Sequence, residues 1–197
     1  MPLVKRKSPA PHLPTRAALD LPDPAGRRAA ALEMTRQADV PALLHALAGE
    51  PVAEVREAIV TSLIGIRSED AATGLVALLN HEDTALRNDA IEGLRCMGEA
   101  AAGALGAALR HADPDVRLFA VNALDQKQAP WARAPLRTVL AEEADVNIGL
   151  AAVEALAEGG GPEDAAALAA FAARFPDEPM VAFAVGVALD QIGAGAP

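Results

Sequence analysis

Aromatic residues and cysteine are scarce in this chain. Its 197 residues include no tyrosine, four phenylalanines and one tryptophan, although 52% of them are hydrophobic. The core must therefore be built from alanine, leucine, valine and isoleucine, which favours helices packed through small side chains over a β-sandwich. Because Cys96 is the single cysteine, no intrachain disulfide can form, and a reducing cytoplasm is the expected location. We expect Cys96 itself to be a buried thiol that behaves as a small hydrophobe.

Long apolar runs are also absent. No stretch approaches the roughly 18 to 20 apolar residues that a membrane-spanning helix needs, so we expect no membrane span. The first ten residues are basic, but prolines follow them instead of an apolar segment. This pattern does not predict a secretory signal.

The start of the chain carries a net positive charge, whereas the rest is acidic. Residues 1–36 carry seven basic and three acidic side chains, a net charge of 7 − 3 = +4. Because the whole chain carries −10, the other 161 residues sum to −14. An acidic body repels phosphate backbones, so no nucleic acid is expected as a partner.

An arginine within a short apolar phrase recurs along the chain. It stands at Arg27, Arg56, Arg87 and Arg117, and the same position continues without arginine at Gly149 and Ala182. The spacings are 29, 31, 30, 32 and 33 residues. A period in this range indicates an array of small stacked units.

Each unit is predicted to contain two helices. In the second unit the apolar residues Val55, Ile59, Val60 and Leu63 lie along one helical face, and the same offsets recur in later units. Alanine-rich second helices follow. We therefore predict an all-α chain with a basic, proline-rich arm over residues 1–23 and a single solenoid over residues 24–197. The sixth unit has only a first helix, so the array contains about five and a half helical hairpins.

An acidic residue stands four positions before the arginine position in most units. The set is Asp23, Asp83, Asp113, Asp145 and Glu178, and in several units a proline follows at once. A carboxylate at the N-cap accepts unpaired amide hydrogens, and proline suits the first helical position. These acids are therefore predicted to be helix caps.

The recurring arginine sits at the wrong end of the helix dipole and needs a compensating contact. A guanidinium fork can bridge two carboxylates. We therefore hypothesise a ladder in which Arg27, Arg56, Arg87 and Arg117 each bridge the capping acid of their own helix and that of the adjacent unit.

The segments Asp83–Leu94 and Asp113–Leu124, with an Asp-x-x-x-Arg phrase at the start of each, resemble HEAT repeats of the short bacterial kind also found in phycobilisome lyases. The resemblance covers roughly residues 23–193. It implies a right-handed superhelix with first helices on the convex side and second helices on the concave side. Such arrays usually serve as protein-binding scaffolds.

Two surfaces are candidates for contact with a protein partner. On the implied concave face, the residues of interest are Asn80, His81, Arg110, His111, Trp131, Arg133 and Arg137; Trp and Arg are enriched at binding hot spots. Alternatively, Trp131 fills the turn beside Lys127. The basic arm is the second candidate, and it either docks on an acidic partner or covers the first repeat.

The histidines do not indicate a catalytic or metal site. Some HEAT-repeat hydroxylases bind two irons through several His-Glu pairs, but this chain has one such pair, His81-Glu82, and Ala112 follows His111. We expect His81 and His111 to meet the last carbonyls of the second helices. No nucleophile triad or glycine-rich phosphate loop is evident, so no enzyme activity and no cofactor are predicted. The main hypothesis is a non-enzymatic scaffold. The alternative is an accessory or chromophore-lyase-like subunit that binds a small anion through Arg110, Arg133 and Arg137.

Overall fold

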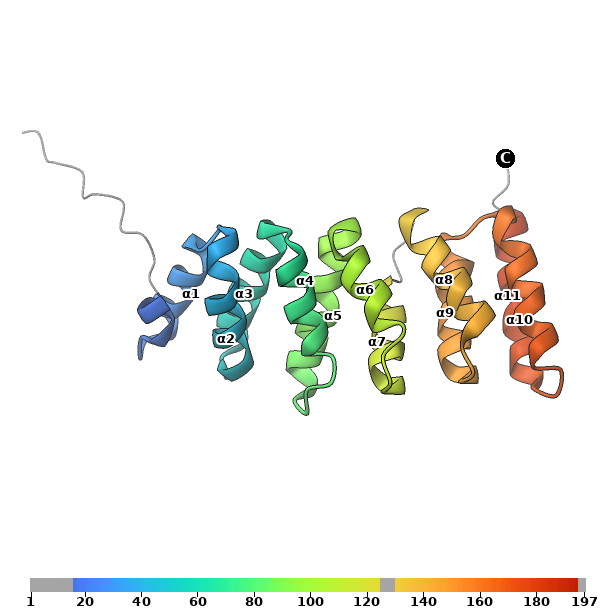
Figure 1. Cartoon of the computed structure of the whole chain (residues 1–197), viewed down its shortest axis with the longest axis horizontal. Coiled ribbons are helices and arrows are strands. Elements are labelled where there is room, and N and C mark those ends of the chain that lie inside the picture. The colour runs from blue at the N-terminus through green and yellow to red at the C-terminus, as the bar shows by residue number, and fades with distance from the viewer. Residues whose placement is uncertain (1–15, 125–129, 195–197) are drawn as a thin grey trace, which may run out of the picture.

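The computed structural model describes residues 16–124 and 130–194, and these residues form a two-layered array of helices (Figure 1). The first helices of the repeats are α1 (Pro24–Glu33), α3 (Ala53–Ile66), α5 (Thr84–Met97), α7 (Pro114–Leu124), α9 (Val146–Gly159) and α11 (Pro179–Ala194). The second helices are α2 (Val40–Gly49), α4 (Glu69–Ala77), α6 (Ala102–Ala108), α8 (Pro130–Glu142) and α10 (Ala165–Arg174). The predicted all-α array of five hairpins and one further helix is confirmed.

Short 3₁₀ segments complete the described secondary structure. They are η1 (Arg16–Asp20), η2 (Gln37–Asp39), η3 (Gly98–Ala101) and η4 (Pro162–Asp164). Three of them, η2, η3 and η4, lead directly into second helices. No described helix combines the length and the apolar character needed to cross a membrane.

The core lies between the two helix layers. Each first helix packs on the first helix of the next repeat, and second helices pack on their own neighbours in the same way. Seven residues after the arginine position, Leu63, Leu94, Leu124 and Leu156 are all buried. Each buried leucine stabilises the array by roughly 1.5 to 3 kcal/mol. Because a lone hairpin leaves these side chains uncovered, stacking is what stabilises each repeat.

The N-terminal end of the array is covered by η1. This segment packs on α1 and α2, and Leu19 within it is buried. Residues 16–23, which the sequence assigned to the arm, therefore lie against the first repeat. Residues 1–15 of the predicted arm lie outside the described residues, and their role stays a prediction.

Cys96 departs from the sequence prediction because it is exposed instead of buried. It lies nine residues after Arg87 on the outward face of α5, whereas the next residue, Met97, is fully buried. Its Sγ donates to Oε1 of Glu92 at 3.3 Å, one turn earlier on the same surface.

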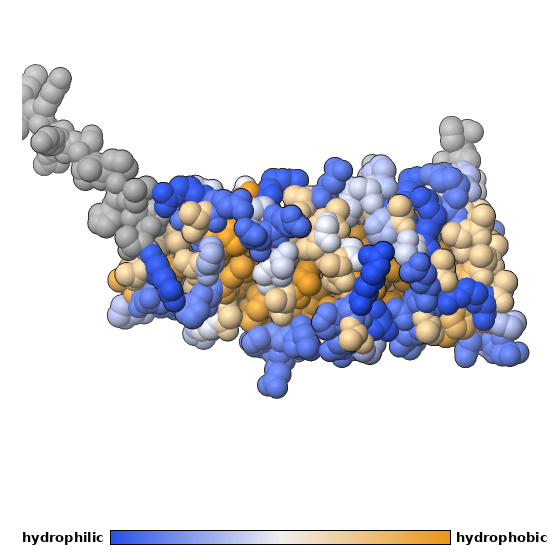
Figure 2. Space-filling model, in the orientation of Figure 1, coloured by the Kyte–Doolittle hydropathy of each residue, from blue (hydrophilic) through white to orange (hydrophobic). Residues whose placement is uncertain are grey.

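Figure 2 shows apolar side chains along the middle of one face of the array and polar side chains along its two edges.

Candidate functional site

Aspartates cap the first helices at their N-termini. Asp23 accepts the amides of Ala25 and Gly26 at 3.3 and 3.0 Å. The equivalent carboxylates of Asp83, Asp113 and Asp145 each accept the amide two residues later, at 2.8, 3.0 and 2.8 Å. These contacts satisfy helix amides that have no partner within the helix.

The recurring arginine binds the loop that precedes its own helix. In Arg27, Arg56, Arg87 and Arg117, Nη1 donates to the main-chain carbonyls six and five residues earlier, at 2.7 to 3.4 Å. For Arg56, Arg87 and Arg117 these carbonyls follow the preceding second helix, so the guanidinium lies beyond the negative end of that helix. For Arg27 they follow η1. This position compensates for the unfavourable place of the arginine in its own first turn.

The acids that pair with these arginines are not the capping aspartates, so the hypothesised ladder is corrected. Glu50 accepts Arg27 through two contacts of 2.7 and 2.8 Å, and Glu143 accepts Arg117 at 2.8 and 3.2 Å. Asp89 accepts Arg56 at 2.6 Å. Each ion pair joins consecutive repeats, as the ladder required, but through different carboxylates.

These pairings shift the pKa values of both partners. The hydrogen bond from Arg117 is the main cause that lowers the pKa of Glu143, and the same bond raises the pKa of Arg117. The charges of the capping residues Asp113 and Asp145 raise the pKa of Arg117 further. Capping acids therefore attract the arginine through space, while Glu143 makes the contact.

Either a glutamate or a histidine occupies one position of the middle repeats, six residues before the arginine position. Glu50 and Glu143 accept the amides of Val52 and Asp145 at 3.0 and 2.9 Å. At the equivalent place in the intervening repeats, Nδ1 of His81 and of His111 accepts the amide two residues later, at 3.1 Å in both. The contact that each histidine ring makes is thus an acceptance through Nδ1 from the start of the next helix, in place of the expected donation to the last carbonyls of the second helix.

The residue at this position determines the contacts of the arginine in the preceding repeat. A glutamate accepts hydrogen bonds from the amide two residues later and from that arginine, whereas a histidine accepts only the amide. Arg87, which precedes His111, accordingly donates to Oγ1 of Thr84 at 3.0 Å and lies 5.6 Å from the centre of the Phe119 ring.

The fifth repeat replaces its missing arginine from another helix. A Cβ at Gly149 would lie 2.3 Å from two carbons of the fully buried Phe171 ring, so no side chain fits there. Arg174, on α10, instead donates through Nη2 to the carbonyl of Glu143 at 2.8 Å. That carbonyl lies six residues before Gly149, which is where the arginine would have donated.

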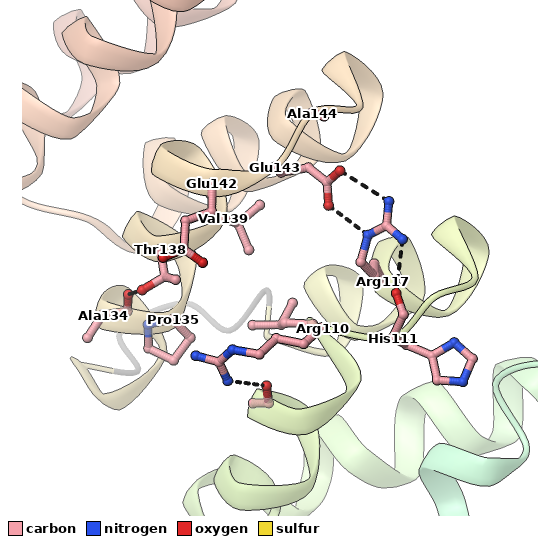
Figure 3. A pocket seen from close by; sticks show the side chains of 12 residues that line it. Arg110, His111, Arg117, Ala134, Pro135, Thr138, Val139, Glu142, Glu143 and Ala144 are labelled. Carbon is pink, nitrogen blue, oxygen red and sulfur yellow. Dashed lines mark hydrogen bonds and ion pairs between the residues drawn. The ribbon is translucent and has the colours of Figure 1, made fainter.

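A pocket of about 540 Å³ opens between α6 and α8. Figure 3 shows Arg110 extending along one wall toward Pro135, with Thr138 and Glu142 on α8 and the Arg117–Glu143 pair farther along the wall. Nη1 of Arg110 donates to the carbonyl of Gly106 at 3.0 Å. Gly106, Ala134 and Pro135 supply little side-chain volume here, and a side chain at Gly106 would meet nothing within 4 Å.

The pocket exists because α8 is bound to the repeat after it. Arg133 donates to the carbonyl of Gly159 at 3.0 Å and forms an ion pair with Glu163. Arg137 forms an ion pair with Asp164, which is fully buried. These contacts hold α8 against η4 and α10, and α8 makes only sparse contact with α6.

The seven predicted contact residues are not brought together. Arg110 and His111 line the pocket, and the His111 ring points away from it (Figure 3). Asn80 is exposed beyond the end of α4, and Trp131 is half-buried against the core without lining the pocket. The turn around Lys127 lies outside the described residues. Because Arg133 and Arg137 pair with acids elsewhere, the three arginines of the anion-binding alternative do not converge.

Sequence reasoning missed the residues that form the pocket itself. Thr138 and Glu142 stand one turn apart on α8, and Gly106 faces them from α6. The proline inside a second helix, Pro135, was the available signal, because it removes a helix hydrogen bond and marks an irregular helix. Within the described residues, no group of three or more His, Cys, Asp or Glu side chains could hold a metal ion.

Comparison with known proteins assigns the family. A sequence model described as HEAT repeats matches residues 14–95 and 102–193. The chain belongs to the HEAT-repeat family. No curated protein matches the sequence. The HEAT hairpins described above are therefore the family's repeats.

Several solved structures are similar to this HEAT-repeat chain. Human deoxyhypusine hydroxylase in complex with glycerol gives a TM-score of 0.49 at 19% identity, covering 91% of this chain and 83% of the hydroxylase chain. The complex of CpcE and CpcF of phycocyanin lyase from Nostoc sp. PCC7120 gives 0.38 at 21%, with 98% of each chain covered. A designed armadillo repeat protein in complex with the peptide (KR)4 gives 0.44 at 20%, covering 92% and 99%.

Proposed function

We propose that this HEAT-repeat chain is a non-enzymatic protein-binding scaffold whose contact surface is the second-helix face around the pocket between α6 and α8. The observation that carries the proposal is the separation of these two helices, which leaves a pocket of about 540 Å³ in an otherwise closely packed layer. A volume of this size receives a few side chains of a partner.

The chemistry of the pocket suits a peptide segment better than a small anion. Leu109 and Val139 supply apolar surface, while Arg110 and Glu142 bring opposite charges to facing walls. A small carboxylate would be attracted by Arg110 and repelled by Glu142. A protein segment can instead place an apolar side chain on Leu109 and Val139 and offer both an acceptor and a donor to the two charges.

Filling the pocket tests this function. Gly106→Leu places a side chain into open space, so it is expected to block the pocket while the fold is retained. Gly65→Leu is the matched control, because a side chain at Gly65, on α3, also meets nothing within 4 Å. Proteins that co-purify with the wild-type chain from a lysate of its native cell are identified by mass spectrometry.

We expect a specific partner to be retained by Gly65→Leu and lost with Gly106→Leu. Arg110→Glu and Glu142→Lys are each expected to weaken its binding, since each reverses a charge at the rim of the pocket. A partner that binds Gly106→Leu as well as the wild type would refute the pocket as the contact surface. Stabilisation of the chain by small carboxylates, lost with Arg110→Glu, would favour the ligand-binding alternative.

A further inference from the structure

The outer surface of the last helix carries unexplained apolar side chains. Met180, Phe183 and Val187 on α11 are 63%, 67% and 39% exposed. Burial of such side chains away from water lowers the free energy of the protein, and a contiguous exposed apolar patch marks an interaction surface.

The internal repeat shows that these positions need not be apolar. They stand two residues before, one after and five after the arginine position. The same three positions are Glu54, Glu57 and Thr61 in α3, and Ala85, Asn88 and Glu92 in α5. The outer surfaces of α3 and α5 are therefore mainly polar at these positions, whereas α11 is apolar at all three.

These side chains border a groove between α9 and α11 of about 510 Å³. One wall is the apolar surface of α11, and the other carries Asn147, Glu154 and Glu158 of α9. Leu150, Ala151, Val153 and Ala157 complete the α9 side with apolar groups. The groove is thus apolar along the α11 wall, while the α9 wall combines apolar groups with two glutamates.

The spacing along the groove is that of a helix-packing seam. On α11, Met180, Ala184, Val187 and Gln191 follow steps of four, three and four residues, and on α9 the residues Asn147, Ala151, Glu154 and Glu158 follow the same steps. Any face of an α-helix shows these steps, so the two walls offer recesses about 5 Å apart, the spacing at which a further helix inserts its side chains. Side chains on one face of an extended strand would recur at about 7 Å instead of about 5 Å along the groove.

The charge of the groove specifies its occupant further. No basic residue is among the described residues that line it. From Ala141 to the last residue, Arg174 is the single basic side chain among ten acidic ones. Arg174 donates to the carbonyls of Leu140 and Glu143, so it is engaged inside the repeat. None of the described groove residues supplies positive charge opposite Glu154, so a basic partner complements this wall.

We propose that the groove between α9 and α11 is a second docking site, on the layer opposite the pocket between α6 and α8, for an amphipathic helix of a partner protein. This helix presents large apolar residues at steps of three and four to Met180, Phe183 and Val187. Lysine or arginine along its flank faces Glu154 of α9.

Two labelled synthetic peptides test the proposal. Both carry leucines at the a and d positions of three heptads; one has lysine and the other glutamate at e and g. Their binding to the full chain is measured by fluorescence anisotropy. We expect the lysine peptide to bind at least tenfold more tightly than the glutamate peptide, with an affinity that falls as salt is added.

Matched variants locate the binding. Val187→Ser is compared with Leu32→Ser, because both residues are 39% exposed and stand five residues after the arginine position. Phe183→Ser and Val187→Ser are each expected to weaken the lysine peptide about tenfold, while Leu32→Ser leaves it unchanged. Glu154→Lys is expected to weaken it severalfold, and Glu57→Lys, the same charge change on α3, much less. Circular dichroism verifies that each variant folds.

Defined outcomes would overturn the proposal. Equal binding of the two peptides would mean unspecific apolar contact, and unchanged binding to Phe183→Ser would place the site elsewhere. A third contradicting outcome would come from sedimentation analysis of the chain alone. Self-association that Phe183→Ser abolishes would assign the groove to a second copy of the chain. Gly106→Leu is expected to bind the lysine peptide normally, which separates this site from the pocket.

Discussion

Arg117 and Glu143 form a two-contact ion pair, at 2.8 and 3.2 Å, that joins the fourth repeat to the fifth. The same carboxylate accepts the amide of Asp145, the cap of α9. One glutamate thus fixes the start of a helix and the position of the preceding repeat. Because both side chains are largely shielded from solvent, the pair is more than a surface contact.

Removal of either partner is expected to weaken the array. Arg117→Met and Glu143→Gln should each lower the free energy of unfolding by about 2 kcal/mol, since each leaves a shielded group without its charged partner. In a double-mutant cycle the two losses should be less than additive. Urea unfolding measures these changes. Exposed Arg28→Met is the control. Additive losses would disprove the coupling.

Stability is expected to depend on pH through Glu50 and Glu143. Hydrogen bonds from Arg27 and Arg117 lower the pKa of these two carboxyls below the ordinary value of 4.5. A lowered pKa in the folded chain contributes stability that is fully present above about pH 4.5 and is lost as the pH falls through the folded-state value. The difference in urea midpoint between wild type and Glu143→Gln should therefore be constant near neutral pH and shrink below pH 4.5. A constant difference down to pH 3 would contradict this, and exposed Glu57→Gln serves as the control.

His111→Glu is expected to stabilise the chain. A glutamate there can accept the amide of Asp113, as Glu143 accepts that of Asp145, and can also bind Arg87. The expected gain is about 0.5 to 1 kcal/mol in thermal or urea unfolding. His81→Glu should gain less, because the preceding Arg56 already pairs with Asp89. Equal gains for the two variants would show that the arginine partner is irrelevant.

Glycines at two first-helix positions are expected to respond oppositely to alanine. Gly149→Ala should cost roughly 1 to 3 kcal/mol, because its Cβ overlaps the buried Phe171 ring. Gly65→Ala should add roughly 0.5 to 1 kcal/mol, since the site is helical and open. Phe171→Leu should reduce the cost of Gly149→Ala. If both alanine variants unfold at the wild-type midpoint, the packing argument fails.

The helices and their caps could be predicted because their signals are local. Apolar residues at fixed offsets decide which face of a helix is buried, and a capping aspartate such as Asp83 binds amides two and three residues away. Both relationships are visible in a short stretch of sequence. The period then extends them to the whole array.

The partners of the arginines could not be predicted in the same way. Glu50 and His81 occupy one position of the repeat but differ in whether they accept an arginine, and this becomes visible only when consecutive repeats are in register. The pocket escaped prediction for a related reason. The pocket forms because Arg133 and Arg137 bind α8 to the following repeat. Neither arginine shows by itself which of the two neighbouring repeats it will contact.

Arg174 makes the main-chain contact that an arginine at position 149 would make, and this affects the order in which the repeats can fold. In the fourth repeat, Arg117 reaches a carbonyl only six residues before it, so this closure is available as soon as the segment leaves the ribosome. The corresponding contact in the fifth repeat joins residues 31 apart, so it can form only after α10 has been synthesised. Because contacts between distant residues form slowly, the first four repeats can close one by one during synthesis, while the fifth and its successor α11 become ordered together.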